Sequence, residues 1–144
     1  MVRTTISLLL LTATAYADAP RGCPAAVTTA VMNAFPDSTI GACKAEHAHG
    51  KDLFEVKLTR AGGDKIEVDV APGGEILQVE EKIAVDALPD AVKRAFAARY
   101  PRTKASGAEK QTAGKDIRYE IAFQAGNVRK EATFTAGGAF VGDE

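Results

Sequence analysis

Residues 50–56 have the sequence GKDLFEV, and residues 114–121 have the similar sequence GKDIRYEI. In each, a glycine suited to a hairpin turn precedes residues that alternate between apolar and polar, which is typical of a strand with one buried face. The two segments lie 64 to 65 residues apart. This spacing predicts that one structural unit occurs twice in the chain.

Further matches flank these segments at the same spacing. They are PAAV at 24–27 with PDAV at 89–92, FP at 35–36 with YP at 100–101, and GG at 73–74 with GG at 137–138. The chain from Cys23 to Leu77 therefore corresponds to the chain from Leu88 to Val141. A unit of about 64 residues alone buries a marginal core, so we expect the two copies to stabilise each other.

Each copy is predicted to begin with an amphipathic helix. A proline suited to the first helical turn precedes apolar residues spaced four apart, and an alanine adds the i+3 position. These apolar residues are Val27, Ala30, Val31 and Phe35 in the first copy, and Val92, Ala95, Phe96 and Tyr100 in the second. Pro36 and Pro101 end the helices, because the residue before a proline is disfavoured in the α region.

After each helix the apolar period changes to two, as in strands with one buried face. The alternating apolar residues are Phe54, Val56, Leu58, Ile66, Val68 and Val70 in the first copy, and Tyr119, Ile121, Phe123, Ala132 and Phe134 in the second. Two weaker strands at 39–47 and 75–80 complete the first set. We therefore predict an α+β fold of two tandem repeats, each with one helix packed on a four-stranded antiparallel meander sheet, at residues 23–81 and 82–144.

Residues 1–17 are typical of a secretory signal peptide, with Arg3, a short apolar stretch and a small-x-small cleavage site that ends at Ala17. The apolar stretch has about nine residues, whereas a membrane-spanning helix needs about 20. We therefore expect a periplasmic or secreted protein that begins at Asp18 and is not inserted in a membrane after cleavage.

The net charge of the mature chain limits the kinds of molecule that it could bind. Loss of Arg3 leaves 17 basic residues against 19 acidic ones, with no polybasic run. Nucleic acids and anionic membranes require concentrated positive charge, so this balance disfavours both. We expect any partner to be an envelope or secreted protein. The oligomeric state is left open by the sequence.

Cys23 and Cys43 are predicted to form a disulfide, because an exported chain meets an oxidising compartment. Their counterparts in the second copy are Leu88 and Ala108, both apolar, which indicates that the two positions lie inside the module. The alternatives are a reactive thiol or a pair of metal ligands. Neither has a CxxC spacing or a companion base in its favour.

Taken together, these motifs resemble the PepSY-like, beta-lactamase-inhibitor-like domain family of exported bacterial proteins. The shared features are the proline-opened helix, the aromatic-proline stop, the GKD strand, EVDV at 67–70, the Gly-Gly turn and the restart LPDAV at 88–92. The resemblance covers residues 23–142 and implies two tandem copies of a helix packed on an antiparallel sheet. It implies a binding or inhibitor-like role, although a fold does not carry function by itself. Lys130 departs from the pattern at the position of Ile66, which predicts a ragged edge for the second sheet.

The usual enzymatic motifs do not occur in the sequence, and we predict neither an enzyme nor a bound cofactor. The alternative function is a small periplasmic metal-binding protein that uses His47 and His49, which would point the same way on a strand. A zinc or copper site would need a third ligand, and Asp52 is the nearest residue that suits. Two exposed polar residues beside a hairpin turn explain the histidines equally well.

Aromatic residues argue against a tight inhibitor. Tight interfaces concentrate Trp, Tyr and Arg, yet this chain has no Trp. Apart from Tyr16 in the signal peptide, its aromatics fall on predicted core positions, which leaves only Phe140 unassigned. The outward strand positions instead alternate in charge, and Asp69 is one of them. We predict that a partner binds the remaining ones, namely Glu55, Lys57, Glu67, Arg118, Glu120, Arg129 and Glu131.

Overall fold

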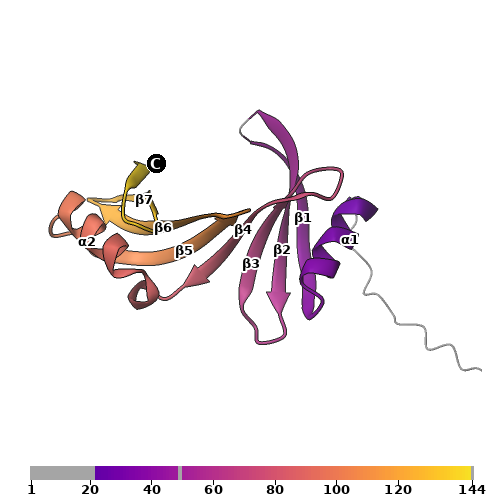
Figure 1. Ribbon diagram of the computed structural model, residues 1–144, viewed down its shortest axis with the longest axis horizontal. Coiled ribbons are helices and arrows are strands. Elements are labelled where there is room, and N and C mark those ends of the chain that lie inside the picture. The colour runs from indigo at the N-terminus through magenta and orange to yellow at the C-terminus, as the bar shows by residue number, and fades with distance from the viewer. Residues whose placement is uncertain (1–21, 49, 144) are drawn as a thin grey trace, which may run out of the picture.

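The computed structural model describes residues 22–48 and 50–143, and the predicted signal peptide and His49 lie outside these ranges. Eight antiparallel strands form one sheet in the order β1 to β8, and two helices pack against it (Figure 1). The first repeat comprises α1 (Ala25–Ala34), β1 (Ser38–Ala48), β2 (Lys51–Arg60), β3 (Lys65–Val70) and β4 (Ile76–Ile83). The second comprises the 3-10 helix η1 (Val85–Ala87), α2 (Asp90–Arg99), β5 (Ala105–Ala113), β6 (Asp116–Ala125), β7 (Val128–Thr135) and β8 (Phe140–Asp143). The predicted fold class of two helix-on-meander repeats is confirmed.

The meanders of the two repeats are one continuous sheet. Strand β4 pairs with β5 from Val79, opposite Thr112, to Ile83, opposite Ala108. The expected boundary between residues 81 and 82 therefore falls within β4, which belongs to both halves of the sheet. In Figure 1, strands β1–β3 run nearly vertically and β5–β7 nearly horizontally, so the sheet twists strongly around this junction.

Each helix covers its own core on the same face of the sheet. In the first repeat Val27 and Val31 are fully buried against residues of β2 and β3. In the second repeat Val92 and Phe96 occupy the corresponding positions against β5–β7. Val79 and Ile83 of β4 contact the first and second core respectively. Because residues four apart on a strand share a face, both helices lie on that face and leave the other one uncovered.

The Gly-Gly turns allow close contact between each helix and the sheet. Gly74 has a φ of +95°, and a Cβ atom added there would lie 2.9 Å from the carbonyl oxygen of Ala26 in α1. Gly138 has a φ of +86°, and its added Cβ would lie 2.6 Å from the carbonyl oxygen of Ala91 in α2. Glycine is therefore required at each of these two positions for two reasons: the positive φ, and the lack of space for a Cβ atom beside the helix.

Alanine at these glycines should separate the two requirements. Gly63 has a φ of +91° with open space around it, whereas Gly73 has neither a positive φ nor a neighbour. We expect Gly74→Ala to lower the free energy of unfolding by about 1 kcal/mol or more beyond Gly63→Ala, because the helix must also move. Gly73→Ala should change it by less than about 0.5 kcal/mol. Equal losses for Gly74→Ala and Gly73→Ala in denaturant titrations would refute this explanation of the turn.

Cys23 and Cys43 form the predicted disulfide, which connects the residue before the N-cap of α1 to β1. Their Cα atoms lie 5.6 Å apart. The corresponding residues of the second repeat, Leu88 and Ala108, are both buried in its core, as the repeat predicted. The bridge thus occupies a position where the second repeat has an apolar contact, and it is consistent with the expected periplasmic or secreted location.

Strand β8 forms the edge of the second repeat, spans Phe140–Asp143 and pairs with β7. Phe140 packs edge-on against Phe134, with 5.7 Å between ring centroids, and the guanidinium of Arg99 lies 3.4 Å from the centroid of its ring. The hydroxyl of Tyr100 donates a hydrogen bond to Asp143 at 2.8 Å. Phe140 therefore joins the last strand to α2, although the residue remains 37% exposed.

Candidate functional site

The face of the sheet opposite the helices is the candidate site, and we call it the outer face. Strand alternation places the predicted binding residues there, because residues of the opposite phase on the same strands, such as Val56, Val68 and Ile121, are buried in the two cores. Glu55 lies opposite Asp69, and Lys57 lies opposite Glu67. In the second half, Glu120, Arg118, Arg129 and Glu131 occupy β6 and β7. Since the sheet is continuous, these two groups belong to one surface.

Several charges on the outer face are paired with each other. Lys57 Nζ lies 3.3 Å from Glu55 and 3.1 Å from Glu67. Arg129 contacts Glu131 at 2.6 Å. Arg118 turns towards the hairpin tip, where it contacts Asp116 at 2.7 Å. Exposed pairs of this kind contribute about 0 to 1 kcal/mol each, so they are available for exchange with a partner's charges.

Strands β4 and β5 add outer-face residues that the sequence analysis did not assign. Glu80 and Lys82 come from β4, and Glu109 and Gln111 come from β5. Glu80 lies opposite Glu67, and Glu109 lies opposite Glu120. The alternation of apolar and polar residues that marks a strand is weak in β5, because Lys110 and Thr112 are polar residues on the face that bears the helices. Alternating glutamate and glutamine at 109 and 111 was the only available indication.

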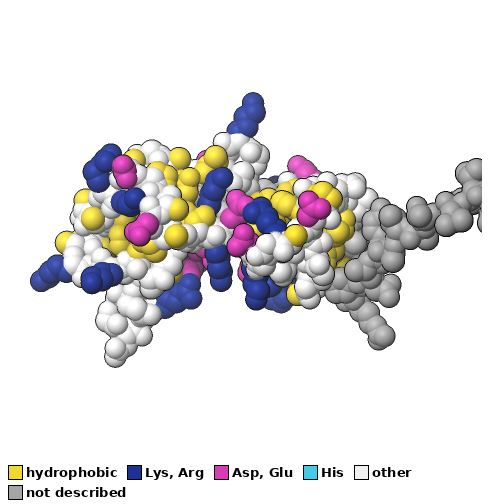
Figure 2. Space-filling view, turned by 90° about the horizontal axis from the view of Figure 1, so that it is seen from below, with side chains coloured by type: hydrophobic (Ala, Val, Ile, Leu, Met, Phe, Trp, Pro, Cys, Tyr) yellow, Lys and Arg dark blue, Asp and Glu magenta, His cyan; other side chains and the backbone are white. Residues whose placement is uncertain are grey.

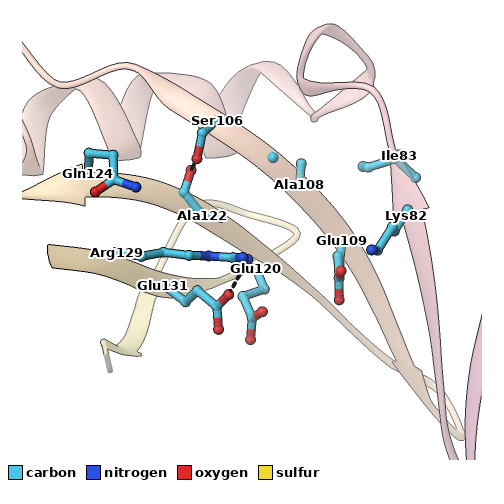
Figure 3. A pocket seen from close by; sticks show the side chains of 11 residues that line it. Lys82, Ile83, Ser106, Ala108, Glu109, Glu120, Ala122, Gln124, Arg129 and Glu131 are labelled. Carbon is cyan, nitrogen blue, oxygen red and sulfur yellow. Dashed lines mark hydrogen bonds and ion pairs between the residues drawn. The ribbon is translucent and has the colours of Figure 1, made fainter.

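The outer face is hollowed in both halves of the sheet. The larger hollow has a volume of about 410 Å³ and lies over β4–β7. Figure 3 shows the carboxylates of Glu109, Glu120 and Glu131 projecting from the sheet on the side away from the helix. The smaller hollow, of about 220 Å³, lies over β1–β5, and Lys82 and Glu109 border both. Figure 2 shows acidic and basic side chains interspersed in the middle of the molecule, between areas of hydrophobic atoms.

Glu120 has the most perturbed environment on this face. The pKa of its carboxyl is raised from 4.5 to about 7, first by burial and then by the negative charges of Glu131, Glu109 and Glu80. Gln111 Nε2 donates a hydrogen bond of 3.1 Å to Glu120 and opposes the shift. Burial also raises the pKa of Glu80, which accepts a hydrogen bond of 2.7 Å from Gln78. The larger hollow therefore holds one carboxyl, that of Glu120, whose pKa is about 7.

This environment predicts a pH dependence of stability. Between pH 4.5 and about 7 the folded protein keeps a proton on Glu120 that the unfolded chain has lost. The free energy of unfolding should therefore fall as the pH rises through this window, because the folded state binds more protons. Glu120→Gln should flatten the decline, whereas Glu75→Gln, at an exposed turn position, should preserve it. Urea titrations at several pH values measure the slope, and the same slope in both variants would contradict the assignment.

The histidine pair of the alternative function is only partly described. His47 lies in β1 near the hairpin tip, and its Nδ1 lies 2.7 Å from Asp52 Oδ1. His49 lies outside the described residues. Within residues 22–48 and 50–143, no group of three His, Cys, Asp or Glu side chains is arranged to hold a metal ion. In the same ranges, no helix is long and apolar enough to cross a membrane.

Comparison with solved structures identifies the fold. A BLIP-like protein from Bacteroides fragilis is 18% identical with a TM-score of 0.65, and the match covers 84% of this chain and 85% of that one. A DUF2874 family protein from Bacteroides uniformis is 18% identical with a TM-score of 0.68, covering 84% and 88%. A protein from Bacteroides eggerthii, named as a candidate periplasmic protein, is 17% identical with a TM-score of 0.69, covering 85% and 88%.

The chain thus has the fold of the BLIP-like and DUF2874 proteins, in agreement with the resemblance seen in its sequence. No protein-family model and no curated protein sequence matches it. At this level of identity the likeness concerns the fold alone, so function must be argued from the outer face.

Proposed function

We propose that the protein is an exported, non-enzymatic binding module that contacts an envelope or secreted protein through its outer face. The observation that carries this proposal is the continuity of that face. Both helices lie on the other side, and eight strands present one uncovered surface with charged residues from both repeats. A single repeat would present half of this surface, which gives the duplication a functional reason.

Non-catalytic binding fits the chemistry of the outer face. Its charged side chains are carboxylates, lysines and arginines, several of which pair with one another, as Lys57 and Arg129 do. The BLIP-like name of a structural neighbour is in keeping with such a role. The relation to this chain is one of fold, so the name supports the class of function and does not identify a target.

The outer face also indicates how a partner is held. The described aromatic residues pack in or against the two cores, except Phe140 on β8, which contacts Phe134 and Arg99 and is 37% exposed. Polar and ionic contacts therefore provide most of the attraction. Tight interfaces use buried aromatic anchors, so we expect at most micromolar inhibition of a beta-lactamase.

Capture from envelope extract with the mature protein tests the proposal. We expect a captured protein to be released between low salt and 1 M salt, where the Debye length is about 3 Å. The charge reversals Glu67→Lys and Arg129→Glu should reduce capture. Arg94→Glu is the matched control, because Arg94 is exposed on α2. Capture that resists salt, or that is lost in Arg94→Glu and kept in the outer-face variants, would refute the proposal.

A further inference from the structure

We infer that the edge of β1 pairs with β1 of a second copy of this chain, antiparallel and centred on Ala45, so that two eight-stranded sheets join into one. This inference goes beyond the proposed function, because it concerns the edge of the sheet and a different partner. Three observations support it: the unpaired side of β1, the pairing of the corresponding strand in the second repeat, and the arrangement of charges along β1.

Strand β1 lies at one end of the sheet. Among the described strands it pairs with β2 alone, from Ser38 to Ala48. Strand β3 pairs with β2 only as far as Phe54, so the hairpin of β1 and β2 extends beyond the rest of the sheet, as Figure 1 shows near its top. Alternate residues of an edge strand direct their N–H and C=O groups to the unpaired side, where another strand can bind them.

The corresponding strand of the second repeat already has such a neighbour. Strand β5 pairs with β4 through residues 108–112, which correspond to residues 43–47 of β1 at the spacing of the repeat. Helix α1 also leaves this side of β1 accessible. The buried residues beneath α1 belong to β2 and β3, whereas Ala45 and His47 on the same face of β1 are exposed. The edge of β1 can therefore accept a strand as the edge of β5 does.

The regular part of β1 is symmetric about Ala45. A bulge interrupts the register between Ile40 and Ala42, and from Ala42 to Ala48 the pairing with β2 is uninterrupted. Ala45 is the midpoint of this stretch. Pairing of identical strands about a two-fold axis at this midpoint places Ala42 opposite Ala48 of the second copy, and Ala45 opposite its own equivalent. These positions carry small side chains in both copies, so the two edges can approach closely.

The charges of β1 favour this register over its neighbours. Lys44 lies opposite Glu55 of β2 and therefore belongs to the outer face, as does Glu46. With the axis at Ala45, each lysine lies opposite the glutamate of the other copy, which gives two pairs of opposite charge. An axis at Lys44 or at Glu46 would instead place two like charges opposite each other, which destabilises a sheet.

Within one chain these two charges already form an ion pair. Lys44 Nζ lies 2.7 Å from Glu46, and both side chains remain accessible to solvent. An exposed pair contributes about 0 to 1 kcal/mol, so it can be exchanged for pairs between copies. A lysine on an edge strand commonly opposes pairing between copies. Here the glutamate two residues further along supplies the opposite charge and reverses that effect.

Two charge reversals test the register. Analytical ultracentrifugation of the mature protein should show a dimer whose fraction rises with concentration. Lys44→Glu leaves two glutamates on each copy and Glu46→Lys leaves two lysines, so either variant alone should raise the dissociation constant about tenfold or more. An equimolar mixture of the two variants should restore association, because each glutamate then faces a lysine of the other copy. Mixing cannot restore the ion pair within a chain, so this result is specific to contact between copies.

Arg94→Glu is the matched control, since Arg94 is exposed on α2 in the other repeat, and it should leave the dissociation constant unchanged. Circular dichroism verifies the fold of each variant. A mature protein that stays monomeric, a dimer that Lys44→Glu does not weaken, or a mixture that associates no better than its components would overturn the inference. If the protein is monomeric alone but Lys44→Glu abolishes capture of an envelope protein, the edge binds a strand of that protein, and the inference is wrong.

Discussion

Phe96→Ala is expected to lower the free energy of unfolding by about 3 to 5 kcal/mol, the largest effect of any single truncation considered for this protein. Phe96 is 6% exposed and lies at the centre of the second core. Its ring contacts those of Tyr100, Phe123 and Phe134, with centroid separations of 5.3, 5.5 and 6.4 Å. Removal of the ring opens a cavity beneath α2, and the neighbouring rings lose their contacts with it.

Denaturant titration of the mature protein, followed by circular dichroism, measures this loss. Val31→Ala is the matched comparison, since Val31 occupies the corresponding position in the first core and is fully buried. It should lower the free energy of unfolding by about 1 to 2.5 kcal/mol. A loss below about 0.5 kcal/mol for Phe96→Ala would show that the helix stripe has been assigned to the wrong face.

Loss of the disulfide should have the second largest effect. Cys43→Ala is expected to lower the free energy of unfolding by about 2 to 4 kcal/mol, because the bridge closes a loop of about 20 residues in the unfolded chain. The first repeat depends on this bridge most directly, since it connects the chain before α1 to β1. Hydrogen exchange should therefore show faster opening in α1 and β1 than in α2 and β5.

Two controls accompany this prediction. Free-thiol titration of the unfolded, unreduced protein should find none, since both described cysteines are bridged. Ala108→Cys alone creates a thiol at the corresponding position of the second repeat and should leave exchange in the first repeat unchanged. Uniformly faster exchange in both repeats of Cys43→Ala would mean that the bridge supports the whole sheet.

Much of the fold could be predicted because each helix and strand occurs in two copies with different side chains, so the pattern in one copy could be checked against the other. Val27 and Val92, or Val31 and Phe96, indicate the same buried stripe from different side chains. The disulfide gained support in the same way, since Leu88 and Ala108 are buried where the cysteines form a bridge. Periodicity is a strong signal when apolar residues alternate without interruption, as they do in β3.

The rest depends on contacts between residues far apart in the chain. Glu109 and Glu120 become neighbours only because β5 and β6 pair in a particular register, which periodicity does not specify. The joining of β4 to β5 is a similar case, because nothing in the repeat distinguishes two sheets from one continuous sheet. Phe140 could not be assigned from the sequence, because the residues it contacts, Arg99 and Phe134, lie on other elements.

Site-specific photo-crosslinking in the exporting cell tests most directly whether the outer face is the binding surface. A photoreactive side chain replaces Thr133, which lies opposite Glu120 on the outer face, or Ala97, which is exposed on α2. The account predicts a crosslink to another exported protein from position 133, weakened by Glu67→Lys, and no such product from position 97. A crosslink from position 97 with none from position 133 would contradict it.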